Sequence, residues 1–253
     1  MNNMLRSIYQ ILKKQIRPYP KWYLQDLQLL LKQKQQDSTF PIGNRFPILH
    51  ERTDEGGTMK GHYFHQDLYV ARLIYEAKPQ RHLDIGSRTD GFVAHVATYR
   101  EIEIIDIRPI KSEVRNIVFR QADLMQLPQD LVGYCDSVSS LHAIEHFGLG
   151  RYGDPINYFG YLEALNNIYL ILKSGGTFYF SVPIGKQRIE FNAQRVFSVK
   201  YLVGLFGEKY HIEAFSYVND QGDFVENALM NDQNINSNFG CEYGCGIFTL
   251  RKK

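Results

Sequence analysis

The feature that most constrains the fold is an alternation of short apolar runs with helical segments, which begins after Pro79. Segments of helical periodicity near 90–99, 157–172 and 198–206 separate the apolar runs. This alternation is typical of a mostly parallel sheet with helices on both faces. We therefore predict an α/β, Rossmann-like fold with seven strands, at His82–Ile85, Ile102–Ile107, Ile117–Arg120, Ser137–Leu141, Thr177–Val182, 210–218 and 246–251, and a tight turn at Lys173–Gly176.

A different pattern precedes this region, so we divide the chain into an N-terminal extension, 1–61, and a main domain, 62–253. Leucine and isoleucine at helical spacing predict two amphipathic helices, 4–16 and 21–35, which prolines at 18 and 20 separate. A long loop is predicted from Asp37 to about Gly61, and a helix from about Phe64 to Ala77.

Charge is unevenly distributed, although the whole chain has a net charge of only +2. Residues 1–36 hold seven basic residues against one acidic residue, Asp26. Such a segment suits peripheral contact with an anionic membrane face, and a solvated helix face is the alternative interpretation. Because the basic residues cluster outside the main domain, we expect no nucleic-acid partner.

The three cysteines, Cys135, Cys241 and Cys245, are too few and too scattered for a disulfide scaffold. They fit a reducing compartment, and we expect a cytoplasmic protein, since no apolar run is long enough for a membrane span or a secretory signal. Cys241 and Cys245 could be zinc ligands, but no second ligand pair lies nearby in the sequence, so we expect no metal.

Polar residues at the ends of successive strands indicate a nucleoside-binding site. Asp84, Gly86 and Ser87 lie where the first strand meets the first helix, and glycine there lets a ligand approach the backbone. Asp106 ends the second strand, 20 residues after Gly86, where a carboxylate can accept both hydroxyls of a ribose. Asp123 follows the third strand and can bind an adenine amino group. A helix cap or turn role is the alternative for Asp106, and an N-cap role is the alternative for Asp123.

Histidines near the end of the fourth strand are the candidate general bases. His142, Glu145 and His146 follow this strand, and a carboxylate beside a histidine can orient it; a structural role at the strand end is the alternative. The run also spells the H-x-x-E-H motif of zinc proteases, but that motif needs a helix, whereas this run follows a strand. His62 and His65 could instead join Asp67 and Glu145 in a metal site.

Two loops at the same predicted sheet edge, Gly148–Pro155 and Gly185–Arg195, can shape an acceptor pocket or can be solvated. We assign to the acceptor six side chains from these loops and from the segment before the first strand: His62, His65, Arg151, Tyr152, Arg188 and Asn192.

Residues 80–252 resemble the class I S-adenosylmethionine-dependent methyltransferases. The resemblance is carried by Asp84-Ile85-Gly86, by Asp106, by Ala122-Asp123 and by the runs Ser140–His146 and Leu172–Thr177. It implies S-adenosylmethionine as cofactor. The residues assigned to the cofactor are Asp84, Gly86, Ser87, Arg88, Asp106, Ile107, Asp123, Leu124 and Leu141.

Three segments, Gly61–Asp67, Asp84–Phe92 and Leu141–Asp154, are similar to an uncharacterised methyltransferase-like family found among bacterial surface-polysaccharide genes. This likeness implies methyl transfer to a sugar or glycan intermediate. One departure is that Arg88 and Asp90 stand where the first motif of the superfamily usually has glycines. Arg88 can pair with the cofactor's carboxylate or block the site. The alternative function is therefore a non-catalytic scaffold in polysaccharide assembly. A dehydrogenase lacks support because G-x-G-x-x-G is missing.

Overall fold

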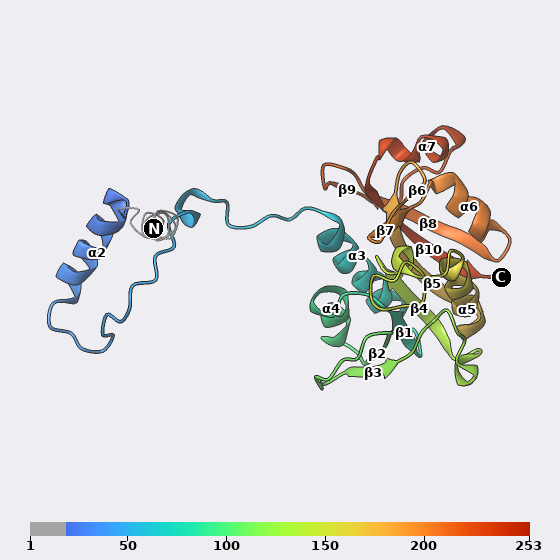
Figure 1. The fold of residues 1–253 in the computed structure, drawn as a ribbon, viewed down its shortest axis with the longest axis horizontal. Helices are drawn as coiled ribbons and strands as arrows, with labels where there is room; N and C mark the ends of the chain where they lie inside the picture. The colour runs from blue at the N-terminus through green and yellow to red at the C-terminus, as the bar shows by residue number, and fades with distance from the viewer. Residues whose placement is uncertain (1–18) are drawn as a thin grey trace, which may run out of the picture. The chain divides into compact units, whose positions relative to one another are not determined.

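The computed structural model describes residues 19–253, and these fall into two compact units that meet between Thr58 and Met59. The first unit contains the helix α2, Lys21–Lys34, and a single 3-10 turn, Glu51–Thr53 (Figure 1). The helix predicted at 21–35 is confirmed to within one residue, and the helix predicted at 4–16 lies outside the described residues. No side chain of α2 is buried.

An eight-stranded sheet forms the centre of the second unit, with the strand order β3-β2-β1-β4-β5-β10-β8-β9 (Figure 1). Strands β1 to β5 run parallel, and β10 pairs antiparallel with both β5 and β8. The predicted α/β fold is confirmed; the additional strand is the two-residue β9. The strands are β1 His82–Ile85, β2 Ile102–Asp106, β3 Ile117–Gln121, β4 Cys135–Leu141, β5 Leu172–Ile184, β8 Tyr210–Val218, β9 Phe224–Val225 and β10 Gly244–Lys252.

Helices cover both faces of this sheet, because the strands are apolar on both sides. Helix α3, His62–Ala77, and the short α4, Ala94–Ala97, pack in one apolar cluster with the residues of one face. Helices α5, Gly160–Ile171, and α6, Val199–Gly207, pack in a second cluster that also contains strand residues. Buried parallel strands of this kind carry near-continuous apolar runs, which is why their positions could be predicted.

Several local features differ from the prediction. The segment Lys173–Gly176 is not a separate turn, because β5 begins at Leu172, directly after α5. Between Leu172 and Thr177 the register of β5 against β4 shifts, and Gly175 within this irregularity has a φ of +72°. The loop expected at Gly185–Arg195 contains a hairpin of β6, Arg188–Glu190, and β7, Gln194–Val196. The helix expected near 90–99 begins with one π-helical turn, Thr89–Val93. A short helix, α7, Asp232–Asn236, was not predicted.

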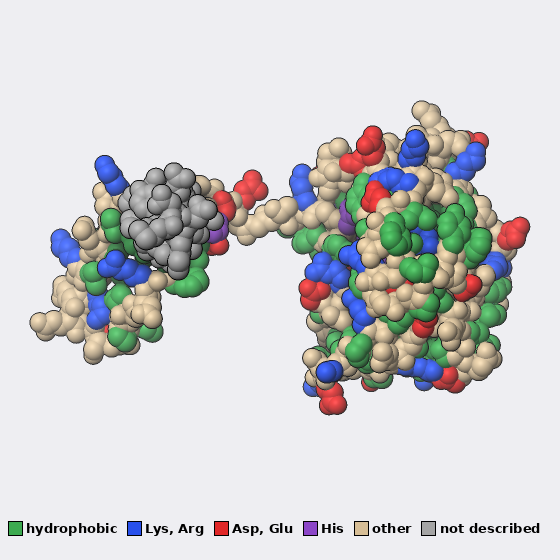
Figure 2. Space-filling view, in the orientation of Figure 1, with side chains coloured by type: hydrophobic (Ala, Val, Ile, Leu, Met, Phe, Trp, Pro, Cys, Tyr) green, Lys and Arg blue, Asp and Glu red, His purple; other side chains and the backbone are tan. Residues whose placement is uncertain are grey.

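No helix in the described part of the chain is long and apolar enough to cross a membrane. On the face shown in Figure 2, apolar side chains gather over the region of α6 and the β6–β7 hairpin. The exposed apolar residues of this hairpin and of the segment before α5 include Ile156, Tyr158, Phe159, Ile189 and Phe191.

Candidate active site

The candidate site lies where the strand order reverses, between β1 and β4, as expected for ligands of doubly wound sheets. A pocket open to solvent occupies this position, with about 520 Å³ of empty space when its open, solvent-filled part is included. Its walls come from the ends of β1, β2, β3 and β4 and from the segment after β4. They are formed by Ile85, Gly86, Ile105, Asp106, Ile107, Arg108, Ala122, Asp123, Leu124, Met125, His142, Ala143, His146, Phe147, Tyr152 and Asp154.

The turn after β1 is built around a buried carboxylate. Asp84 accepts hydrogen bonds from the Ser87 backbone N–H at 3.1 Å and the Ser87 hydroxyl at 2.6 Å, and also from Ser139. Burial raises the pKa of Asp84 to about 6, although these hydrogen bonds oppose the rise. Ser87 Oγ in turn accepts from the Leu141 backbone N–H at 3.0 Å. Three residues assigned to the cofactor, Asp84, Ser87 and Leu141, therefore tie β1 to β4 and do not line the cavity.

Gly86 is the backbone position that this turn requires. Its φ is +69°, in the left-handed region that favours glycine, and a Cβ there would lie 3.0 Å from Cβ of Ala143. Gly86 also lines the cavity, so its bare backbone is open to a ligand at this point.

Asp106 lies in the cavity wall, at the end of β2, but its carboxylate already has a partner. Arg108 donates from Nε to Oδ1 at 3.0 Å and from Nη2 to Oδ2 at 2.7 Å, and its guanidinium stacks over Tyr152 at 4.1 Å. The sequence reasoning missed Arg108, although its position two residues after the acid was a usable signal. A ribose that bound both oxygens of Asp106 would have to displace this side chain.

Three of the residues assigned to the cofactor, Ile107, Asp123 and Leu124, lie together in the cavity wall. Oδ1 of Asp123 accepts from the Met125 backbone N–H at 2.9 Å, which is the contact of a turn and differs from the N-cap role considered for this residue. The other carboxylate oxygen is not used by that bond.

Arg88 does not fill the cavity. Its guanidinium donates two hydrogen bonds to the exposed Asp90, from Nε to Oδ1 at 3.0 Å and from Nη2 to Oδ2 at 2.8 Å. It also stacks over the ring of Tyr63, 4.6 Å from the ring centroid. It lines a second, adjoining hollow, together with Ser87 and Tyr152. Arg88 therefore lies outside the walls of the first cavity, in the hollow that adjoins it.

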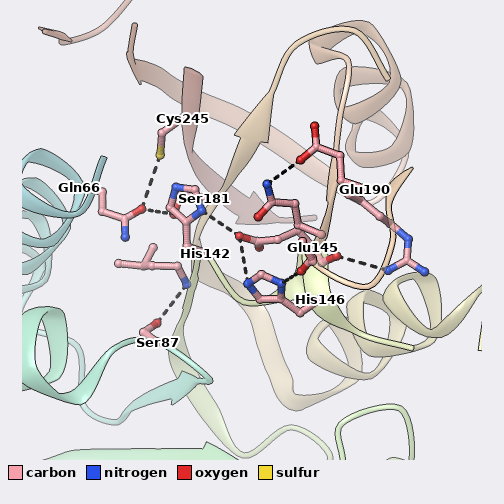
Figure 3. Close-up of polar contacts among 12 residues, drawn as sticks. Gln66, Ser87, His142, Glu145, His146, Ser181, Glu190 and Cys245 are labelled. Carbon is pink, nitrogen blue, oxygen red and sulfur yellow. Dashed lines mark hydrogen bonds and ion pairs between the residues drawn. The ribbon is translucent and has the colours of Figure 1, made fainter. Parts of the chain in front are cut away.

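The residues after β4 form a compact buried group (Figure 3). His142 Nδ1 donates to Glu145 Oε1 at 2.8 Å, and His146 Nε2 lies 3.7 Å from the same oxygen. His146 Nδ1 donates to the Ala193 carbonyl at 2.7 Å. Burial lowers the pKa of His146, which Glu145 opposes. Burial also disfavours charge on His142, but the acidic groups of Cys245 and Glu145 outweigh it and raise the pKa of His142 to about 10.

The six residues assigned to the acceptor divide into two groups. His62 stacks on the His142 ring at 5.2 Å, and Tyr152 lies in the cavity wall, edge-on to His146 at 5.4 Å. Arg151 donates to the Ala193 carbonyl at 3.0 Å, the same oxygen that His146 uses.

Of the first three, only Tyr152 lines the cavity; the remaining acceptor residues, like His62 and Arg151, are not part of its walls. His65 lies one helical turn after His62, and its ring stacks on Phe224 of β9, with 5.4 Å between the ring centroids. Arg188 pairs with Glu190 within the hairpin and lines a separate hollow with Tyr158 and Arg195. Asn192 is exposed between β6 and β7.

Comparison with solved structures identifies the fold as that of the class I S-adenosylmethionine-dependent methyltransferases. The chain is similar to a 1,6-didemethyltoxoflavin-N1-methyltransferase from Burkholderia thailandensis with bound S-adenosylhomocysteine (14% identity, 74% of this chain and 78% of that chain covered, TM-score 0.54). It is also similar to the N-methyltransferase NodS from Bradyrhizobium japonicum WM9 in complex with S-adenosyl-l-homocysteine (12% identity, 76% and 88% covered, TM-score 0.50). A third similar structure is the cyclase SpnF (15% identity, 73% and 80% covered, TM-score 0.51).

By sequence, the chain belongs to the family described as "Caenorhabditis protein of unknown function, DUF268", whose model matches residues 95–240. This range includes β2, β4 and the His142–His146 segment, but begins after the turn at Gly86. No curated protein matches the sequence.

Proposed function

We propose that this protein is an S-adenosylmethionine-dependent methyltransferase. The observation that carries the proposal is one cavity that contains the Gly86 turn, the Asp106 carboxylate and Asp123 in its walls, with His146 in the same wall. These groups come from four parallel strands whose carboxyl ends meet at the switch point, where nucleoside ligands bind in such sheets.

Methyl transfer to oxygen or nitrogen is an in-line displacement that needs alignment of the two substrates and a base for the acceptor proton. His146 is the base in this proposal. Its Nδ1–H is engaged by the Ala193 carbonyl, so Nε2 is left as the acceptor nitrogen of the neutral ring. The lowered pKa of His146 keeps that nitrogen unprotonated near neutral pH. Glu145, 3.7 Å from Nε2, stabilises the charged ring once it has taken the proton.

For the acceptor we propose a sugar or glycan intermediate of surface-polysaccharide synthesis. The sugar class rests on the sequence resemblance. The aromatic rings beside the cavity, Tyr63 and Tyr152, and the nearby Arg151 supply the stacking faces and donors that bind sugars. The proposal places the reaction in the cytoplasm, where the three free thiols of the chain would stay reduced.

One observation favours the second candidate function, a non-catalytic scaffold in the same assembly. Arg108 occupies the carboxylate that would bind the ribose, and a ligand has to displace it before the cofactor can bind as proposed. The similar fold of a cyclase also shows that this architecture is not confined to proteins named as methyltransferases.

Calorimetric titration of the full chain with S-adenosylmethionine and S-adenosylhomocysteine separates the two functions. The enzyme proposal expects saturable heat with both ligands, followed by transfer of labelled methyl to one member of a panel of nucleotide sugars and glycan precursors. No heat and no thermal shift at millimolar ligand, a concentration at which even binding worth about 4 kcal/mol is detected, would refute it. Binding without transfer to any acceptor would favour the scaffold.

A further inference from the structure

Three potential metal ligands from distant segments meet beside the cavity. They are His62 at the start of α3, His142 directly after β4 and Cys245 on β10, and their ligand atoms all lie within 4.8 Å of one another. His142 and Cys245 are buried and His62 is half-buried. Figure 3 shows the His142 ring between Cys245 on one side and Glu145 on the other.

His142 is held as a metal-binding histidine is held. Its Nδ1–H donates to Glu145 at 2.8 Å, which fixes the ring and leaves Nε2 free. Histidines that bind a metal through one ring nitrogen usually donate the N–H of the other nitrogen to a carboxylate or a backbone carbonyl in this way. Nε2 is buried and has no hydrogen-bond partner among residues 19–253, and an unsatisfied buried nitrogen is costly unless a ligand completes it.

Strand register places Cys245 against this nitrogen. Cys245 pairs with Pro183 on β5, and Leu141 pairs with Ser181 two residues earlier on the same strand, so β10 and the end of β4 flank one point of β5. The thiol donates to Gln66 Oε1 at 3.5 Å, and Ser181 donates to the same oxygen at 2.6 Å. These buried contacts orient the sulfur. Zinc binds the thiolate and the neutral imidazole, so the thiol proton that Cys245 gives to Gln66, and any second proton on the His142 ring, have to be released to solvent when the ion binds.

The third group, His62, closes the cluster from the helix side. Its ring stacks on His142 at 5.2 Å and on Tyr243 at 5.6 Å.

We propose that His62, His142 and Cys245 bind a zinc ion whose fourth position stays open. Imidazole nitrogen and thiolate are the ligands that Zn²⁺ prefers, and three protein ligands with one free position are typical of catalytic zinc. Bond lengths of about 2.0–2.3 Å set the ligand atoms about 3.3–3.8 Å apart in a tetrahedral site. The cluster therefore has to contract by up to about 1.5 Å, which a rotation of the His62 side chain at the helix start can supply. Since His142 also lines the cavity, an ion here would stand at its wall.

A nucleophilic cysteine paired with His142 and Glu145 is the competing interpretation of the same residues. Cys245 is fully buried, whereas an attacking thiolate has to reach its substrate. A cysteine–histidine–carboxylate nucleophile also leaves His62 without a role. The zinc proposal accounts for all three ligand groups and for the unpartnered Nε2, and it does not depend on binding of S-adenosylmethionine.

The test is metal analysis of the full chain, purified without a polyhistidine tag. Elemental analysis is expected to find about one zinc per chain after gel filtration. Exchange of zinc for Co²⁺ is expected to give the visible bands of a tetrahedral ion and a sulfur-to-cobalt charge-transfer band. A wild-type chain that holds no zinc and takes up no Co²⁺, above all one whose Cys245 is then quickly alkylated, would overturn the proposal.

Matched variants locate the site. Cys245→Ser and His62→Ala are expected to lose the zinc, and Cys245→Ser also loses the charge-transfer band. Their controls, Cys241→Ser at another buried cysteine and His65→Ala one turn along α3, are expected to keep both. Circular dichroism confirms that each variant is folded, and His62, at the partly exposed helix start, is the position least coupled to the core. Equal loss of zinc in a variant and its control would refute the assignment.

Glu145→Gln tests the positioning role of the carboxylate. Removing such a partner of a metal-binding histidine typically weakens metal affinity by about 10–100-fold, and we expect a loss in that range from Co²⁺ titration. The thiolate-to-cobalt band should persist at saturation, because the ligands themselves are unchanged. Unaltered affinity would contradict the role of Glu145.

Discussion

Arg108 competes with the cofactor for Asp106, so removing Arg108 should strengthen cofactor binding. The guanidinium holds both carboxylate oxygens of Asp106, at 3.0 and 2.7 Å, and it also covers the ring of Tyr152. A ribose whose two hydroxyls hydrogen-bond to the Asp106 carboxylate must break these contacts. Arg108→Ala removes the competitor and leaves the carboxylate in the cavity wall.

The size of the effect follows from exposure. The side chain of Arg108 is 50% exposed and that of Asp106 is 13% exposed, so their pair belongs to the weak class worth about 0.2–1 kcal/mol. Stacking of a partly exposed guanidinium on an aromatic ring adds about 0.5–1 kcal/mol. In the wild type, breaking the contacts of Arg108 with Asp106 and Tyr152 subtracts up to about 1–2 kcal/mol from the free energy of ligand binding. Arg108→Ala removes this cost, so its Kd for S-adenosylhomocysteine should be about 5–30-fold lower.

A double-mutant cycle read by calorimetry provides the assay. Asp106→Ala alone should weaken binding by about 1–3 kcal/mol, the cost of a lost hydrogen bond to a charged group. In the double variant, the gain from Arg108→Ala should vanish, because there is no carboxylate left to release. Arg120→Ala is the matched control. The guanidinium of Arg120 also binds both carboxylate oxygens of an aspartate, Asp130, but Arg120 lies on β3, outside the cavity walls. Its loss should leave Kd unchanged. Weaker binding in Arg108→Ala would show that the guanidinium contacts the ligand, and the competition argument would be wrong.

Three further predictions concern catalysis, pH and the N-terminal segment. His146→Ala should lower turnover by about 10²–10⁴-fold with nearly unchanged cofactor affinity; unchanged turnover would place the base elsewhere. Burial, with Arg100 adding to it and Asp136 opposing, lowers the pKa of His82 to about 3, so between pH 6.5 and 3 the unfolded chain binds a proton that the folded chain does not. Stability from this group is therefore full above pH 6.5 and falls with falling pH, and urea unfolding at pH 7.5 and 4.5 should show a drop about 2–3 kcal/mol larger in the wild type than in His82→Gln; parallel curves would contradict this. Residues 1–36 should float with anionic but not with neutral liposomes, and equal binding to both would remove the membrane role.

The sequence by itself determined the sheet and the place of the site. Buried parallel strands are written as apolar runs, so β1 and β8 were predicted at their observed bounds, and β2 and β3 to within one residue. The carboxyl ends of parallel strands share one edge of the sheet, so Gly86, Asp106 and Asp123 had to line one cavity once the strand order was known.

Local signals were weaker where side chains do not follow a period. The β6–β7 hairpin has three-residue strands, too short for an alternating pattern to stand out, and the one-turn π-helix has no pattern that sequence reasoning separates from a helix. Asp84, Ser87 and Leu141 were assigned to the cofactor because they match the methyltransferase motifs. In the structure all three are buried, and their hydrogen bonds to one another join β1 to β4.

Only the tertiary structure decided which side chains meet. Cys245 was considered with Cys241, its neighbour in the sequence, yet antiparallel pairing of β10 with β5 carries it to His142 and His62 instead. His65 was grouped with His62 and lies one helical turn after it, but in the structure its ring stacks on Phe224 of β9. Arg108 was not assigned to the site, because its hydrogen bonds to Asp106 depend on the direction of its side chain. Such contacts between distant residues follow from strand register and helix packing, which are set by the whole core and are not encoded in any one segment.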